Sequence, residues 1–201
     1  MFDSMKNKLA TIVGAENVLD DAGLLELYAK DQSFAKGIRP WFIVKPQNAQ
    51  QVQALVKWAN ETSTPLVPVS SGAPHFKGDT VPSAPESVIV DLSGMNKIIS
   101  INRQQRMVVI EPGVTYEQLQ TALAKEGMTL STSLRPKANK SVLTSVLEVE
   151  PRLNCLHQFN YTEPVRCTEV TYGDGNQIFT GVNRFCDSII KLCSSVKQAL
   201  T

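Results

Sequence analysis

The sequence predicts a mixed α+β fold in which a small parallel strand-helix-strand unit is followed by a mixed or antiparallel sheet with flanking helices. The runs WFIVKP (41–46) and PLVPV (65–69) resemble buried strands and are separated by a helical pattern. That order, with short connections, favours a parallel pair joined by a right-handed crossover. Three further runs rich in Val and Ile, at 87–92, 97–102 and 107–112, predict additional strands.

Helical patterns precede and separate these strands. Residues 5–14 and 20–30 have apolar side chains at helical spacing and predict a helical lead-in over residues 1–36. Asn48 is placed to cap the helix between the first two strands. The predicted buried stripe of that helix consists of Val52, Leu55, Val56 and Ala59.

The second half of the chain continues the alternation of helix and strand. Thr115 and Gln118 form a capping-box pattern, which predicts a helix that ends near Gly127. Residues 141–149 resemble a short buried helix. Residues 166–172 alternate like a strand, and a glycine-flanked turn leads from them into the run QIFTG.

Composition narrows the classes of function. The chain has 201 residues, is 42% hydrophobic and carries a formal net charge of +1 without a basic run, so a nucleic-acid partner is not expected. No apolar stretch is long enough for a membrane span or resembles a signal peptide, which predicts a cytoplasmic protein. The four cysteines lack metal-ligand spacing and there are two histidines, so no metal site is expected.

The stretch PVSSGAPHFKGD (68–79) is the main candidate for a binding site. A Gly/Ser-rich loop after a strand can direct several backbone N–H groups at one phosphate. Gly72 and Gly78 permit close approach and positive φ, and Ser70 and Ser71 can add hydroxyl donors. The alternative is a polar connection without a ligand. The stretch is neither a P-loop nor a Rossmann fingerprint.

Four phrases in order, IRPWFIVKPQNAQ, PLVPVSSGAPHFKGD, VIVDLSGMNKI and VVIEPGVTYEQL, resemble the FAD-binding domain of the vanillyl-alcohol oxidase and p-cresol methylhydroxylase superfamily. The resemblance runs from about residue 30 to 180. It implies the p-cresol methylhydroxylase-type fold, with the FAD pyrophosphate wrapped by backbone amides of the loop after the second strand. By similarity, the cofactor-binding residues are Val69, Ser70, Ser71, Gly72, Ala73, Pro74 and His75, with Gly78 closing the loop.

One departure from the family pattern concerns a second glycine-rich segment. No glycine occurs between Gly127 and Gly173, and bulkier residues such as Leu143 would hold the backbone farther from a flavin. Hydroxyl groups could still reach the cofactor there; the alternative is a buried helix with polar caps. These additional candidates for cofactor binding are Ser141, Thr144 and Ser145.

The two histidines receive different interpretations. His75 lies one position later than the histidine to which some relatives attach FAD covalently, so noncovalent FAD is expected. His157 is interpreted as a surface or packing residue, because nothing near it in the sequence completes a catalytic arrangement. No spacing singles out a catalytic base, and the catalytic residue is left unassigned.

The predicted organisation is a lead-in (1–36), a FAD-binding domain (37–182) and a C-terminal amphipathic helix (183–201) that packs on its own domain, a partner subunit or a second copy. The resemblance implies a FAD-binding domain or subunit of an enzyme that oxidises alcohols, hydroxy acids or phenols. Turnover would need a substrate cap domain or a partner. Two alternatives are a shortened, non-catalytic relative that acts in assembly, and a nucleotide binder unrelated to redox chemistry.

Overall fold

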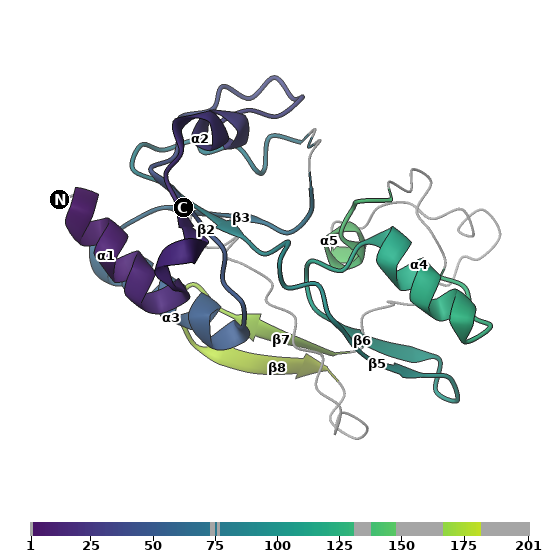
Figure 1. Cartoon of the computed structure of the whole chain (residues 1–201). Helices are drawn as coiled ribbons and strands as arrows, with labels where there is room; N and C mark the ends of the chain where they lie inside the picture. Colours follow the sequence, from purple (N-terminus) through teal and green to yellow (C-terminus); the bar gives the residue numbers. More distant parts are fainter. Residues whose placement is uncertain (1, 73–74, 76, 131–137, 148–166, 182–201) are drawn as a thin grey trace.

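The first sheet of the computed structural model forms the centre of one lobe (Figure 1). The model describes residues 2–72, 75, 77–130, 138–147 and 167–181. The strand order is β1-β2-β4-β3, with β4 parallel to both β2 and β3 and β1 antiparallel to β2. The strands are β1 (Val18–Leu19), β2 (Phe42–Val44), β3 (Leu66–Val69) and β4 (Val88–Asp91).

The predicted pairing of the first two strand runs is wrong in one respect. β2 and β3 are parallel, but β4 lies between them and pairs with both. Every residue of β4 is buried, as expected for a central parallel strand. β3 contains Pro68, which has no N–H to donate to a second neighbour, and this favours an edge position. The short strand β1, with the 3-10 turn before it (Ala15–Asn17), was not predicted.

Helices cover both faces of this sheet (Figure 1). α1 (Phe2–Val13) and α3 (Ala49–Thr62) pack against one face, and α2 (Ala22–Tyr28) packs against the other. Asn48 caps α3 by accepting a hydrogen bond from the Gln51 amide at 2.9 Å, as predicted. The predicted stripe of α3 is buried, and α1 adds Leu9 and Val13 to the same core. The first turns of the chain thus belong to the core of this lobe.

A second lobe has its own core. β5 (Ile98–Asn102) and β6 (Met107–Ile110) form an antiparallel pair, and α4 (Tyr116–Lys125) and α5 (Val142–Leu147) pack near it. The Thr115–Gln118 capping box at the start of α4 is confirmed. The buried side chains of this core are Val109, Ile110, Val114, Tyr116, Leu119, Leu123, Val142 and Leu143.

The predicted strands near residue 170 are present as an antiparallel pair, β7 (Cys167–Thr171) and β8 (Gln177–Gly181). The pair lies against α3 (Figure 1). The Gln53 side chain donates to the Gly175 carbonyl at 2.8 Å, and the Gln177 side chain donates to the Ala49 carbonyl at 3.0 Å. These contacts join the last described strands to the first lobe.

Some predictions concern residues outside the described part of the chain. They are the C-terminal helix (183–201), the interpretation of His157, and the contributions of Ala73 and Pro74. The domain boundaries at residues 36 and 182 stay predictions. Within the described ranges, no helix has the length and apolar character that crossing a membrane requires.

Candidate functional site

The loop after β3 begins at the edge of the first sheet where the parallel strands end. Val69, the last residue of β3, pairs with Asp91, the last residue of β4, and the Leu92 amide donates to the Val69 carbonyl at 2.6 Å. Lys45 follows β2 at the same edge. In open sheets of this kind, ligands bind beside the carboxyl ends of the parallel strands. The predicted loop therefore lies where a ligand site is expected.

A hydrogen bond joins this loop to α5 in the second lobe. The Ser70 and Thr144 hydroxyls are hydrogen-bonded to each other, although the residues are 74 positions apart in the sequence. The space beside Gly72 faces the same segment, because a Cβ added there would approach the Asn139 side chain at 3.7 Å. Ser71 is buried. The structure thus brings the loop that the resemblance assigned to cofactor binding into contact with the segment whose hydroxyls were the additional candidates.

The hydroxyl groups near α5 differ in what they contact. Ser141 is fully buried, donates to the Pro112 carbonyl at 2.6 Å and accepts from the Thr144 amide at 3.2 Å, so its hydroxyl is used within the fold. Ser145 is 1% exposed, and its hydroxyl has no hydrogen-bond partner in the described structure. The side chain of Leu143 belongs to the core of the second lobe. Its bulk is therefore accommodated by that core.

Two described residues in the later part of the loop, His75 and Gly78, are hydrogen-bonded to the segment that follows α2. The His75 carbonyl accepts a hydrogen bond from the Gln32 amide at 2.8 Å, and the Gly78 amide donates to Asp31 at 2.7 Å. Gly78 has a φ of 74°, as its predicted role in closing the loop requires, whereas Gly72 does not adopt positive φ. The Gly78 amide is thus engaged within the protein.

His75 lies half-buried in the loop and is neutral at pH 7. Burial lowers its pKa below the ordinary value and the nearby Lys140 lowers it further, while Asp79, Asp31 and a hydrogen bond with the Ser71 backbone act in the opposite direction. The ammonium group of Lys140 is near enough to this loop to act on the charge of His75. An anion bound there would be stabilised by the same positive charge.

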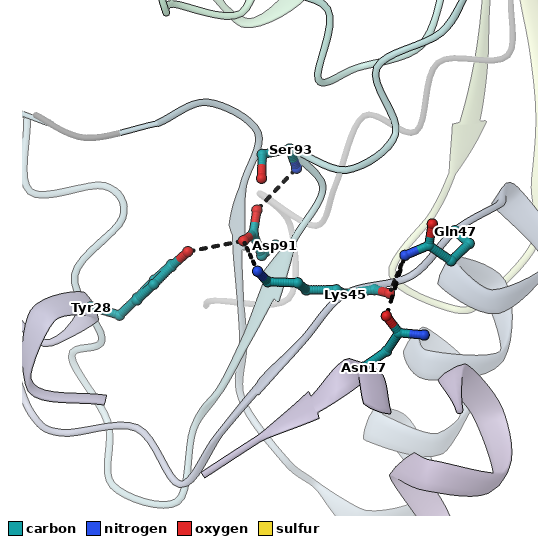
Figure 2. A network of polar contacts seen from close by, with 6 residues as sticks. All are labelled: Asn17, Tyr28, Lys45, Gln47, Asp91 and Ser93. Atoms are coloured by element: carbon teal, nitrogen blue, oxygen red, sulfur yellow. Dashed lines mark hydrogen bonds and ion pairs between the residues drawn. The ribbon is translucent and has the colours of Figure 1, made fainter. Parts of the chain in front are cut away.

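A polar network that the sequence patterns did not predict lies at the edge of the first sheet (Figure 2). Asp91 is 2% exposed and accepts from the Tyr28 hydroxyl at 2.9 Å and from the Ser93 amide at 3.0 Å. The Lys45 ammonium lies 3.8 Å from the same carboxylate, and its side chain is 41% exposed. The sequence feature that indicates this network is Asp91, a single acidic residue at the end of the otherwise apolar strand β4.

This network holds the Asp91 carboxylate in place. Burial, the Asp91 charge and the hydrogen bond to Asp91 all raise the pKa of Tyr28, so the phenol keeps its proton and donates. The Lys45 pair is long and partly solvated and adds little. Asp91 therefore links α2, β4 and the turn at Ser93. It pairs with Val69, the last residue of β3, and so lies beside the start of the loop.

The donors and the open space at the loop fit a diphosphate-containing cofactor. Gly72 is exposed, an added Cβ would have no backbone atom within 4 Å, and the Ser70 and Thr144 hydroxyls meet from two segments. The Ser145 hydroxyl on α5 is buried and has no hydrogen-bond partner in the described structure. Among the described residues, no group of three or more His, Cys, Asp or Glu side chains could hold a metal ion.

The fold and this edge define a class: α+β domains with two lobes that bind a cofactor beside the carboxyl ends of parallel strands. Residues 40–139 match the family model described as "FAD binding domain". Over that segment the chain belongs to the FAD binding domain family. The matched segment includes the loop after β3 and ends just before α5.

Relatives and solved structures agree with this assignment. The chain is 37% identical over 122 residues to D-2-hydroxyglutarate dehydrogenase of Stutzerimonas stutzeri, covering 61% of this chain and 26% of the relative. It is 32% identical over 120 residues to the flavoprotein subunit of 4-cresol dehydrogenase (hydroxylating) of Pseudomonas putida, covering 59% and 23%. A structure of p-cresol methylhydroxylase with substrate bound matches 90% of this chain and 35% of that chain, with a TM-score of 0.72 and 25% identity.

The chain therefore contains the FAD-binding domain of flavin-dependent oxidoreductases, and the resemblance to the p-cresol methylhydroxylase type is confirmed. The predicted α+β fold class is confirmed by the same likeness. The chain spans about a quarter of the length of these curated relatives and about a third of the solved structure.

Proposed function

We propose that the chain binds FAD noncovalently and that its loop, through backbone amides of residues 69–75, holds the diphosphate. The observation that carries the proposal is the hydrogen bond between Ser70 and Thr144, which joins this loop to α5 at the carboxyl edge of the parallel sheet. In this proposal, the Ser70 and Ser71 hydroxyls are additional donors. Gly72 leaves room for the cofactor to approach.

The α5 segment forms the second wall of the proposed site. Thr144 and Ser145 supply hydroxyls there, and Ser141 keeps the start of α5 in place through its bond to the Pro112 carbonyl. Lys140 adds positive potential. In this proposal, oriented backbone amides supply much of the stabilisation of the phosphate charge.

The proposed reaction class is oxidation of an alcohol, a hydroxy acid or a phenol. The relatives named above act, by their names, on 2-hydroxyglutarate and 4-cresol. When bound, FAD supplies the redox chemistry; the residues of this chain bind and orient it. We propose that turnover requires a substrate cap domain or a partner subunit in addition to the FAD-binding domain. The catalytic residue is unassigned.

Noncovalent attachment is supported by the surroundings of His75. Its imidazole is half-buried and hydrogen-bonded to the Ser71 backbone. A ring engaged in this way within its own loop is poorly placed to form a bond to the flavin ring. A cytoplasmic location is part of the same proposal and rests on the sequence alone.

A non-catalytic role in assembly is the second candidate, and the β7-β8 pair favours it. Its side chains Ile178 and Phe179 are 38% and 57% exposed. Two strands alone form a marginal sheet, and apolar side chains on them are suited to contact with another polypeptide. This role predicts a stable complex without any requirement for FAD.

Titration of the purified chain with FAD, followed by flavin fluorescence and the absorbance spectrum, tests the proposal. We expect saturable binding and a yellow protein whose flavin is released into the supernatant by acid precipitation. Flavin that stays with the precipitate would contradict noncovalent attachment. A chain that never binds FAD, yet forms a defined complex, would replace the cofactor role by the assembly role.

A further inference from the structure

We propose that Asp31, which lies outside the segment matched by the family model, is a positioning residue for the FAD loop. The inference rests on the proposed function of residues 69–75. Asp31 follows α2 and is far in sequence from the loop, but its carboxylate contacts the loop directly through the Gly78 amide. Nothing about an acidic residue between a helix and a strand predicts this contact.

Two backbone groups of the loop, the Gly78 amide and the His75 carbonyl, are hydrogen-bonded to the segment after α2. One oxygen of Asp31 accepts from the Gly78 amide at 2.7 Å, and the other accepts from the amide and hydroxyl of Ser33 at 2.8 and 2.5 Å. The neighbouring Gln32 amide donates to the His75 carbonyl at 2.8 Å. Residues 31 and 32 thus fix one donor and one acceptor of the loop backbone.

Close packing supports the same arrangement. A Cβ added at Gly78 would lie 2.9 Å from the Ala35 Cβ and 3.1 Å from the Ser33 hydroxyl oxygen. The backbone of the loop therefore rests against residues 33–35 at this point. A loop that is held in its binding conformation loses less conformational entropy when the cofactor binds, which raises affinity.

The charge of Asp31 is consistent with a holding role. Burial raises its pKa, but hydrogen bonds from Ser33 and Gly78 and the nearby His75 lower it, and the net direction is downward. The carboxylate is therefore ionised at pH 7. Both oxygens are occupied by N–H and O–H donors of the protein, so Asp31 acts through the loop and does not need to contact the diphosphate.

The test compares Asp31→Ala with a matched control, Asp21→Ala. Asp21 also accepts a hydrogen bond from a backbone amide, that of Leu24 at 3.0 Å, but it caps α2 and does not touch the loop. We expect Asp31→Ala to weaken the binding of FAD and of ADP about tenfold, the size of effect expected when a charged hydrogen bond is lost. Asp21→Ala should lower the thermal midpoint without changing either affinity.

Asp31→Asn provides a second variant that tests the mechanism. Its amide oxygen can still accept from the Gly78 amide. Its NH₂ group can donate to the Ser33 hydroxyl but also faces the Ser33 amide, another donor, so affinity should be only partly restored. This variant replaces Asp31→Ala if the latter does not fold. Wild-type affinity in Asp31→Ala, or an equal loss in Asp21→Ala, would overturn the positioning role. Where Asp31→Ala does not fold, wild-type affinity in Asp31→Asn would overturn it. Absence of FAD binding in the wild-type chain would instead refute the proposed function.

Discussion

Replacing Gly72 by valine is expected to leave the fold intact and to remove most FAD binding. The residue is exposed, does not use positive φ, and an added Cβ would have only the Asn139 side chain within 4 Å. Valine is therefore tolerated in the free protein, where surface substitutions usually change stability by about 0.5 kcal/mol or less. In the complex, the branched side chain would occupy the space beside the loop amides.

The expected loss of affinity is about a hundredfold, since forcing extra atoms into a filled site costs up to roughly 3 kcal/mol and each tenfold corresponds to about 1.4 kcal/mol. Gly94→Val is the matched control. Gly94 is also exposed, and an added Cβ would meet only the Gln47 side chain at 3.9 Å, but it lies outside the loop. FAD titrations and thermal midpoints of both variants measure the effect. Equal FAD affinities in the two variants would contradict the proposal that the loop after β3 binds FAD.

Replacing Asp91 by alanine is expected to lower the free energy of unfolding by about 3 kcal/mol, because breaking up a buried charged network leaves its partners without an acceptor. The Tyr28 hydroxyl and the Ser93 amide both donate to this buried carboxylate. Urea unfolding measures the loss.

Two single variants separate the contributions within this network. Tyr28→Phe removes one hydrogen bond and should cost about 1 kcal/mol. Lys45→Ala removes a solvated partner at 3.8 Å and should cost less than about 0.5 kcal/mol. If Asp91→Ala were no more destabilising than Tyr28→Phe, the carboxylate would not be the centre of the network.

Local sequence patterns were sufficient to predict most helices and strands. The caps at Asn48 and Thr115 are formed by side chains within three residues of the amides they bind, so they can be recognised in a short window. Strand neighbours are different, because pairing is decided by long-range contacts. The insertion of β4 between β2 and β3 was therefore missed, although Pro68 was a usable signal for an edge strand.

The candidate site shows the same difference between local patterns, which are predictable, and long-range contacts, which are not. The Gly/Ser composition of residues 70–72 and the resemblance to a family made the loop after β3 the candidate site. The contact between Ser70 and Thr144, and the one between Asp31 and Gly78, join residues 74 and 47 positions apart. No periodicity or spacing encodes such contacts. Asp31 and Asp91 were overlooked because single acidic residues are common on solvated surfaces.

The most direct test of the central proposal follows individual backbone amides by NMR while the ¹⁵N-labelled chain is titrated with FAD, ADP or riboflavin. ADP and FAD share the diphosphate, and riboflavin lacks it. We expect FAD and ADP to shift the amide signals of Ser70, Ser71 and Gly72, and riboflavin to leave them unchanged. Saturable FAD binding with these three amide signals unmoved would contradict the proposal that this loop holds the diphosphate.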